Sequence, residues 1–258
     1  MATSLLPVFA RLFDDAGLFP PASRPMAEAL TAHQLARTGP FGHMVGPFLC
    51  PLARVEELDA CVAGGVPVPA ELSLIVSQDE PRWRRLFLRP SVVQVEALLS
   101  VELPAEALRV PRYLELPPGG DVKTAVDEAV RRRARVKMRC GGLTPDTVPS
   151  TERLGEVLVA CADRRLPLKA TAGLHHPFRH HSAETGGVQH GFLNLLAGAS
   201  AAMAGAPIGE VVSLLEVEDD NRSMALDRID RRSRDLVASI GSCSIDEPVA
   251  DLQALNLL

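Results

Sequence analysis

The chain has 258 residues, of which 47% are hydrophobic and 23% are charged, a balance that is typical of a folded globular protein and excludes a disordered one. A net charge of −5 and an isoelectric point near 5.8 argue against a nucleic-acid partner. No apolar stretch reaches the roughly 20 residues of a membrane helix and no export signal is evident, so we expect a cytoplasmic protein with no membrane partner.

Short apolar segments alternate with amphipathic ones along the chain. Eight segments are predicted as strands, at 8–13, 43–49, 71–77, 92–99, 112–116, 135–140, 167–171 and 237–241. Helices are predicted at 25–37, 52–63, 121–133, 150–164, 189–204 and 247–257. Strand–helix alternation favours a parallel sheet, and the chain length is close to the ~250 residues of a (β/α)8 barrel. We therefore predict an α/β fold, a (β/α)8 TIM-type barrel, as a single domain over residues 1–258.

Two connections depart from a regular barrel. The segment 104–110 between the fourth and fifth strands is short, so one barrel helix should be reduced to a turn. The segment 172–236 between the seventh and eighth strands is long, and we expect an insertion there that carries a lid or extra helices.

Lysine is scarce in this chain. Of the 27 Lys and Arg residues only three are lysines, Lys123, Lys137 and Lys169. Arginine cannot replace lysine where an amine must lose its proton, because the guanidinium stays protonated in proteins. Lys123 lies in the first turns of a polar predicted helix and needs no special explanation. Lys137 and Lys169 lie in predicted strands, and they are candidates for amine chemistry.

Alternation of side chains along the strands predicts which residues face the inside of the barrel. The inward set is Ser73, Ile75 and Ser77 on the third strand, Gln94 and Glu96 on the fourth, Tyr113 and Glu115 on the fifth, Lys137 and Arg139 on the sixth, and Lys169 and Thr171 on the seventh. Five of these are charged, whereas barrel interiors are normally filled by Val, Ile and Leu. A buried ion-pair network is one explanation. A catalytic site at the carboxyl ends of the strands is the other, and lysine scarcity favours it, because arginine would serve equally well in an ion pair.

Three short motifs resemble the class I aldolases, and most specifically the deoxyribose-phosphate aldolase family. They are VKMRCGG (136–142) on the sixth strand, LKATAG (168–173) on the seventh and IGSCS (240–244) at the eighth. In that family, lysines lie on strands six and seven, an acidic residue lies on strand four, and a small Gly/Ser turn after strand eight holds a substrate phosphate. Arg139 and the His-rich loop after the seventh strand have no counterpart in that pattern. The segments DDAGLFPPA (14–22), KATAGLHHP (169–177) and GSCS (241–244) also resemble an uncharacterised group of bacterial proteins.

The resemblance implies a lyase of aldolase type that needs no cofactor and acts on a small phosphorylated or carboxylated carbonyl compound. One lysine would form a Schiff base with the substrate, and analogy with strand six favours Lys137 over Lys169. The other predicted catalytic residues are Glu96 and Glu115, which would move protons, and His175 and His176, whose loop would close over the site. The predicted substrate-binding residues are Arg139, Asp15, Thr171, Gly241 and Ser242.

The histidines leave a second function open. The loop 173–181 holds four of the seven histidines, and His190 follows it. Together with a carboxylate, His175, His176 and His190 are candidate ligands for a divalent metal such as zinc in a hydrolase or isomerase, although no spacing matches a known zinc motif. A third function, a barrel without catalysis, is disfavoured by the five inward charges.

The five cysteines are widely spaced with no CxxC pair, so free thiols are expected rather than disulphides or a zinc knuckle. Cys243 follows the predicted last strand and is a possible nucleophile, but the sequence indicates no histidine partner for it. A small-molecule substrate is the expected partner, and a homo-oligomer is possible.

Overall fold

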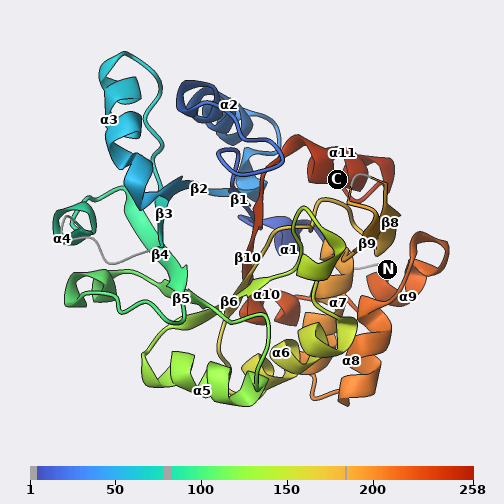
Figure 1. Ribbon diagram of the computed structural model, residues 1–258. Coiled ribbons are helices and arrows are strands. Elements are labelled where there is room, and N and C mark those ends of the chain that lie inside the picture. Colours follow the sequence, from blue (N-terminus) through green and yellow to red (C-terminus); the bar gives the residue numbers. More distant parts are fainter. Residues whose placement is uncertain (1–4, 78–82, 184) are drawn as a thin grey trace.

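Eight of the strands form one closed parallel barrel. The computed structural model describes residues 5–77, 83–183 and 185–258, and its barrel strands follow the order β1-β10-β7-β6-β5-β4-β3-β2 around the ring. The helices lie outside this ring (Figure 1). The predicted (β/α)8 barrel is confirmed.

Seven of the eight predicted strands are present within a few residues of their expected bounds. The barrel strands are β1 (Phe13–Asp15), β2 (Val45–Pro51), β3 (Leu72–Val76), β4 (Val92–Leu98), β5 (Arg112–Glu115), β6 (Arg135–Arg139), β7 (Leu168–Thr171) and β10 (Val237–Ser242). Every neighbouring pair is parallel, so all carboxyl ends meet at one mouth of the barrel, where barrel enzymes keep their active sites.

The first strand is the exception, and its predicted position at 8–13 is wrong. Residues Leu6–Phe9 form the short helix α1, which has Pro7 in its first turn, where the N–H that proline lacks has no partner within the helix in any case. Arg11 then adopts a positive φ of 50°, and the strand begins only at Phe13. The apolar run before it suits a strand or a buried helix equally, and the proline decides between them. As a result, Asp14 and Asp15 lie within a barrel strand rather than after it.

The helices follow the predicted pattern closely. They are α2 (Met26–Thr38), α3 (Val55–Ala63), α4 (Trp83–Leu86), α5 (Val122–Arg131), α6 (Thr151–Asp163), α7 (Phe192–Met203), α8 (Ile208–Leu215), α9 (Ser223–Leu226), α10 (Arg232–Leu236) and α11 (Asp246–Ala254). Asp121 and Ser150 cap α5 and α6 by accepting from backbone N–H groups, as their positions predict. A single 3-10 turn, η3 (Ala105–Arg109), replaces the helix between β4 and β5, as expected from the short connection.

The long connection from β7 to β10 contains more structure than a lid. It begins with an antiparallel hairpin, β8 (His180–Ser182) and β9 (Gly187–Gln189), which the sequence does not predict. The buried helix α7 follows and packs against α6, α8 and α10. Figure 1 places the hairpin beside α11, near the C-terminus. In the described part of the chain, no helix has both the length and the apolar character to cross a membrane.

Apolar packing lies mainly between the strands and the helices. Residues that face the helices, such as Val95, Leu114, Val136 and Ala170, are almost fully buried. The interior of the barrel has a different composition, because Glu96 and Lys169, both with 0% exposure, lie on the inward faces of β4 and β7. An unpaired charge in such a place costs several kcal/mol. The fold therefore requires these charges to be paired with one another.

Candidate active site

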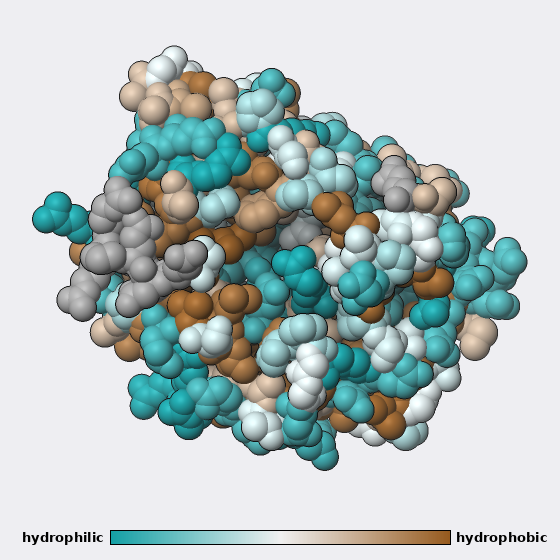
Figure 2. All heavy atoms as spheres, in the orientation of Figure 1, coloured by the Kyte–Doolittle hydropathy of each residue, from teal (hydrophilic) through white to brown (hydrophobic). Residues whose placement is uncertain are grey.

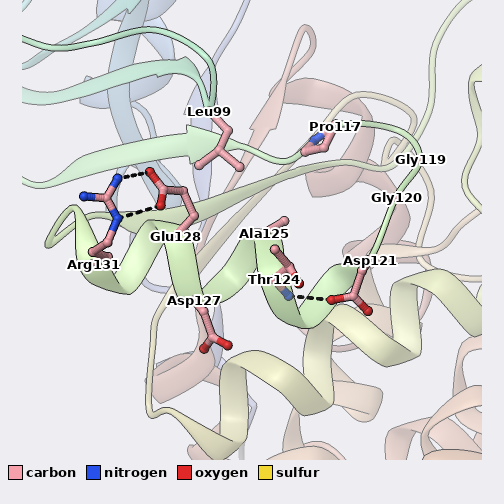
Figure 3. Close-up of a pocket in the computed structure, with 10 residues that line it drawn as sticks. All are labelled: Leu99, Pro117, Gly119, Gly120, Asp121, Thr124, Ala125, Asp127, Glu128 and Arg131. Carbon is pink, nitrogen blue, oxygen red and sulfur yellow. Dashed lines mark hydrogen bonds and ion pairs between the residues drawn. The ribbon is translucent and has the colours of Figure 1, made fainter.

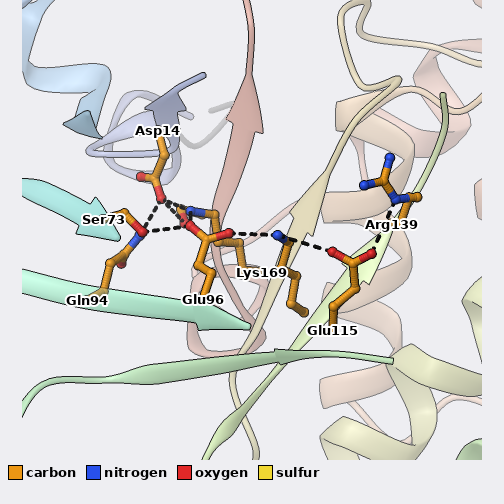
Figure 4. Close-up of polar contacts among 9 residues, drawn as sticks. Asp14, Ser73, Gln94, Glu96, Glu115, Arg139 and Lys169 are labelled. Atoms are coloured by element: carbon orange, nitrogen blue, oxygen red, sulfur yellow. Dashed lines mark hydrogen bonds and ion pairs between the residues drawn. The ribbon is translucent and has the colours of Figure 1, made fainter. Parts of the chain in front are cut away.

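A continuous chain of charged side chains crosses the inside of the barrel. Its ion pairs run from Asp14 through Lys169, Glu96 and Lys137 to Glu115 and Arg139. Figure 4 labels all of these residues except Lys137. It holds three carboxylates and three cations, so its formal charge is zero when all are ionised. The side chains come from the neighbouring strands β4, β5, β6 and β7 and from β1 on the other side of β10. The inward orientation predicted for these residues on β4 to β7 is confirmed by these contacts.

One end of this chain is closed around Lys169. The ammonium of Lys169 donates to Asp14 Oδ2 at 2.5 Å and to Glu96 Oε1. Three neutral side chains complete the arrangement, because Gln94 and Ser239 each donate to Asp14 at 2.9 Å and Ser73 donates to Glu96 at 2.7 Å. Lys169 has 0% exposure, and it is therefore a buried cation with both of its carboxylate partners fixed by further hydrogen bonds.

These contacts fix the protonation of Lys169 and Glu96. Burial alone would strongly lower the pKa of Lys169, but the charges and hydrogen bonds of Asp14 and Glu96 outweigh it and raise this pKa above the ordinary 10.5. Burial alone would raise the pKa of Glu96, but the ammonium groups of Lys169 and Lys137 lower the pKa of its carboxyl to about 2. At neutral pH, Lys169 is therefore a permanent ammonium and a poor nucleophile, and Glu96 is a permanent carboxylate.

The other end of the chain, at Lys137, is more open. Lys137 Nζ lies 2.9 Å from Glu96 Oε2 and 3.1 Å from Glu115 Oε2, and 7% of the residue is exposed. Glu96 Oε2 has no hydrogen-bond partner of good geometry among the described residues, so its contact with Lys137 is an ion pair only. Arg139 is the last charged residue at this end of the chain of charges. Its Nε lies 3.3 Å from Glu115 Oε1, and 53% of its side chain is exposed. The amine of Lys137 is thus held near carboxylates without being enclosed by them.

The two lysines lie side by side in the sheet. Lys137 on β6 and Lys169 on β7 are directly in register, and Glu96 binds one with each of its carboxylate oxygens. A second ammonium nearby would by itself disfavour protonation of the first. The position of Glu96 changes that argument, because a negative charge lies between the two cations and offsets their repulsion.

Of the two adjacent aspartates, Asp14 rather than the predicted Asp15 joins the charged network. Asp15 was the predicted substrate-binding carboxylate, yet its oxygens contact His33 Nδ1 at 3.1 Å and the backbone N–H of Gly17 at 2.9 Å. Asp14 takes its place beside Lys169. The wrong position of the first strand hid this, since side-chain alternation within the true strand places Asp14 and Asp15 on opposite faces.

The remaining predicted binding residues lie near the mouth of the barrel. Thr171 follows Lys169 by two positions on β7, and its buried Oγ1 has no hydrogen-bond partner among the described residues. Gly241 was predicted as the last residue of the eighth strand and Ser242 as the residue after it, but Ser242 also belongs to the strand. They are the last two residues of β10, in register with Asp14 and Asp15 of β1. The hydroxyl of Ser242 donates to the carbonyl of Ser244 at 2.5 Å, so this side chain stabilises the following turn.

The predicted histidines do not form one cluster. His175 Nδ1 contacts Glu247 and His176 Nδ1 contacts Asp251, both at 2.8 Å and both on α11. His190 instead has Nε2 2.8 Å from the carbonyl of Pro149, and burial lowers the pKa of His190. Over residues 5–77, 83–183 and 185–258, no group of three or more His, Cys, Asp or Glu side chains is arranged to hold a metal. The geometry therefore gives no specific support to a zinc site on these residues.

A cleft of about 630 Å³ lies on the outside of the barrel, along α5 (Figure 3). Its polar residues already bind one another, as Asp121 caps α5 and Glu128 pairs with Arg131 at 2.5 Å. None of the predicted site residues lines it. Figure 2 shows hydrophilic and apolar side chains interspersed over the face of the molecule that is seen in Figure 1. Neither feature competes with the buried charges as a candidate for the chemistry.

Comparison with known proteins adds little to this geometry. No protein-family model matches the sequence, and no curated protein matches it significantly. Among solved structures, dihydropteroate synthase of Xanthomonas albilineans, in complex with indole-2-carboxylic acid and 6-chloroguanine, is similar over 96% of this chain and 92% of its own, with 14% identity and a TM-score of 0.44. A likeness at this level leaves the function open, and the fold assignment rests on the strand order given above.

Proposed function

We propose that this barrel is an aldolase-like lyase in which Lys137 forms a Schiff base with a small anionic carbonyl compound. The observation that carries the proposal is the contrast between the two lysines. Lys169 is enclosed and held as an ammonium, whereas Lys137 lies beside it at the open end of the same network. Nearly all basic residues of this chain are arginines, yet both of these positions hold lysine.

The charges around Lys137 suit an iminium. When an amine condenses with a carbonyl compound and loses water, the protonated iminium that forms carries the same single positive charge as the ammonium. Glu96 and Glu115, at 2.9 and 3.1 Å from Lys137 Nζ, would stabilise either cation. The network would therefore stay neutral through formation of the intermediate, with no charge left unpaired inside the barrel.

Each neighbour of Lys137 has a role in this chemistry. Glu115 is the better proton acceptor of the two carboxylates, because 13% of its side chain is exposed whereas Glu96 is bound by Lys169 and Ser73. Glu115 would take the proton that Lys137 must lose and later return it. Arg139 has an exposed guanidinium that would bind a phosphate or carboxylate of the substrate. The unpartnered hydroxyl of Thr171 would bind a substrate oxygen at the mouth.

The test is covalent trapping. The purified protein is incubated with a panel of small phosphorylated and carboxylated aldehydes and ketones and reduced with borohydride, and the modified residue is located by mass spectrometry. We expect one adduct, on Lys137. Lys137→Arg should abolish it, since no free amine remains at that position. Lys169→Arg should keep the adduct site and reduce the yield, and Lys123→Arg is the control that changes nothing.

The same experiment decides between the proposal and its alternatives. A Schiff-base site keeps its adduct in the presence of EDTA, whereas turnover that EDTA abolishes would favour the metal-dependent hydrolase or isomerase. An adduct distributed over all three lysines, or none with any carbonyl compound of the panel, would leave the charged interior as an ion-pair scaffold. Circular dichroism of each variant shows that the fold is kept.

A further inference from the structure

The structure gives Cys243 the histidine partner that the sequence does not reveal. Its Sγ lies 3.7 Å from Nε2 and 4.0 Å from Nδ1 of His175, which is 68 residues away in the chain. Nε2 is the ring nitrogen nearer to the thiol, and Nδ1 lies 2.8 Å from Glu247 Oε2. The order thiol, imidazole, carboxylate is the arrangement in which a base activates a nucleophile and a third group orients the base.

Three elements bring these residues together at the mouth of the barrel. Cys243 directly follows β10, His175 lies four residues after β7, and Glu247 is in the first turn of α11. Strands β7 and β10 are neighbours in the barrel, so the residues after them emerge side by side at its carboxyl end. Cys243 also lies close to the N-terminus of α11, where the helix dipole favours a thiolate.

The other cysteines show what this arrangement adds. Burial raises the pKa of Cys50, Cys140 and Cys161 to about 12 in each case, so these thiols stay protonated. Cys243 is also buried, although its exposure of 7% exceeds the 0% of those three, and it faces an imidazole. The hydrogen bond with Cys243, together with Glu247, raises the pKa of His175 to about 9, although burial opposes this. At neutral pH the imidazole is therefore protonated, and it can donate a proton to an oxygen that is bound beside Cys243.

We propose that Cys243, His175 and Glu247 form a nucleophilic thiol site that binds small aldehydes as reversible thiohemiacetals. In this step a bond forms between Sγ and the carbonyl carbon, and the π electrons of the C=O bond move to its oxygen. That oxygen takes the proton from His175 Nε2, and Glu247 keeps the ring oriented through Nδ1. No oxidant or second reactant is needed. The slight exposure of Cys243 restricts the site to small electrophiles.

The site is independent of amine chemistry at Lys137, so each proposal can fail without the other. The two sites also share no residue, since the charged network uses no residue of the β7–β8 loop or of α11. The titratable groups that face His175 are Cys243 beyond β10 and Glu247 on α11. The adjacent His176 pairs with Asp251 and does not take part.

The first experiment is alkylation of the native protein with a limiting amount of iodoacetamide at pH 6.5, followed by peptide mass spectrometry. Cys61, which is partly exposed and has no histidine contact among the described residues, is the internal control. An ordinary thiol with a pKa of about 8.5 is only about 1% thiolate at this pH. Because a stabilised thiolate is also less nucleophilic, we expect Cys243 to react roughly tenfold faster than Cys61 rather than a hundredfold.

Variants and an aldehyde complete the test. His175→Asn should reduce the alkylation rate of Cys243 at pH 6.5 about tenfold, and Glu247→Gln should reduce it less, with Cys61 unchanged in both. In a Lys137→Arg background, where no Schiff base can form there, acetaldehyde should protect Cys243 and not Cys61. The proposal is overturned if Cys243 reacts no faster than Cys61, if neither variant changes its rate, or if acetaldehyde gives no protection. Because wild-type protein alone provides the rate comparison, a variant that fails to fold does not remove the test.

Discussion

Lys169 and Lys137 are the same residue on neighbouring strands in the same register, yet they occupy opposite environments. Lys169 has 0% exposure and donates to two carboxylates that are themselves bound by Gln94, Ser239 and Ser73. Lys137 contacts one carboxylate that it shares with Lys169 and a second that it shares with Arg139. The difference arises from the partners, since both lysines are directed into the barrel.

This comparison shows how one network can serve stability and chemistry at once. The closed end holds its charges permanently, because Lys169 lies between two carboxylates that accept further hydrogen bonds from Gln94, Ser239 and Ser73. It supplies a fixed electrostatic background for the open end. If Lys137 forms a Schiff base, as proposed above, the protonated iminium keeps the charge of the ammonium and no charge is left unpaired. Preorganised charge of this kind is a large term in enzyme catalysis.

The largest expected difference between the two ends is in stability. Lys169→Met leaves Asp14 and Glu96 buried beside each other with one cation fewer, and loss of a buried partner typically costs about 3–5 kcal/mol. Lys137→Met leaves Glu96 paired with Lys169 and Glu115 paired with Arg139, so we expect a loss of only about 1–2 kcal/mol. The free energies of unfolding are measured by urea titration at pH 7.

The exposed Lys123 provides the control for that measurement. Lys123→Met should change the free energy of unfolding by less than about 0.5 kcal/mol, as surface substitutions usually do. Equal losses for Lys169→Met and Lys137→Met would contradict the distinction between a closed and an open end. Lys137 would then be a structural cation like its neighbour, and the case for it as a nucleophile would be weakened with it.

Much of this network follows from the sequence, and its failures have physical causes. Alternation along β4, β5 and β6 places Glu96, Glu115 and Lys137 on the inside, and lysine scarcity singles out the lysines. Asp15 was chosen over Asp14 because the apolar run before them suits either a helix or a strand, so the strand was placed too early. Alternation also cannot show that Glu96 lies between the lysines, because that depends on the register of the four strands β4 to β7.

Contacts between loops that are distant in the sequence are even harder to predict from hydrophobic periodicity. The β8–β9 hairpin is only three residues long on each side, and its polar sequence gives no strand pattern. The contact between Cys243 and His175 joins the ends of two neighbouring strands through side chains in irregular loops. Hydrophobic periodicity carries no information about such pairs, whereas the closed barrel order brings them together.

A second way to sharpen the comparison is acid unfolding. The pKa of Glu96 is about 2 in the folded protein, below its ordinary 4.5, so its stabilising contribution is full above pH 4.5 and is lost as the pH falls towards 2. Glu96→Gln should destabilise the protein at pH 7 and reduce the fall in stability between pH 5 and 2. Glu115→Gln, at the open end, should cost less at pH 7. A Glu96→Gln variant with the acid dependence of the wild type would show that this carboxyl does not govern the closed end.

The smallest expected effect on stability is at Arg139, where the open end meets solvent. Its side chain is 53% exposed and its ion pair with Glu115 is long at 3.3 Å, so Arg139→Gln should change the free energy of unfolding by less than about 1 kcal/mol. The effect on binding should be larger, because a charge-assisted contact to a substrate anion contributes about 1.5–3 kcal/mol. We therefore expect the carbonyl concentration for half-maximal borohydride trapping on Lys137 to rise by about tenfold or more, with the maximal yield unchanged. The matched control is Arg131→Gln on α5, which also removes an exposed arginine from a pair with glutamate but lies outside the barrel. If both substitutions leave trapping unchanged, Arg139 does not bind the substrate anion, and the open end would have to recognise its ligand through Thr171 and the backbone instead.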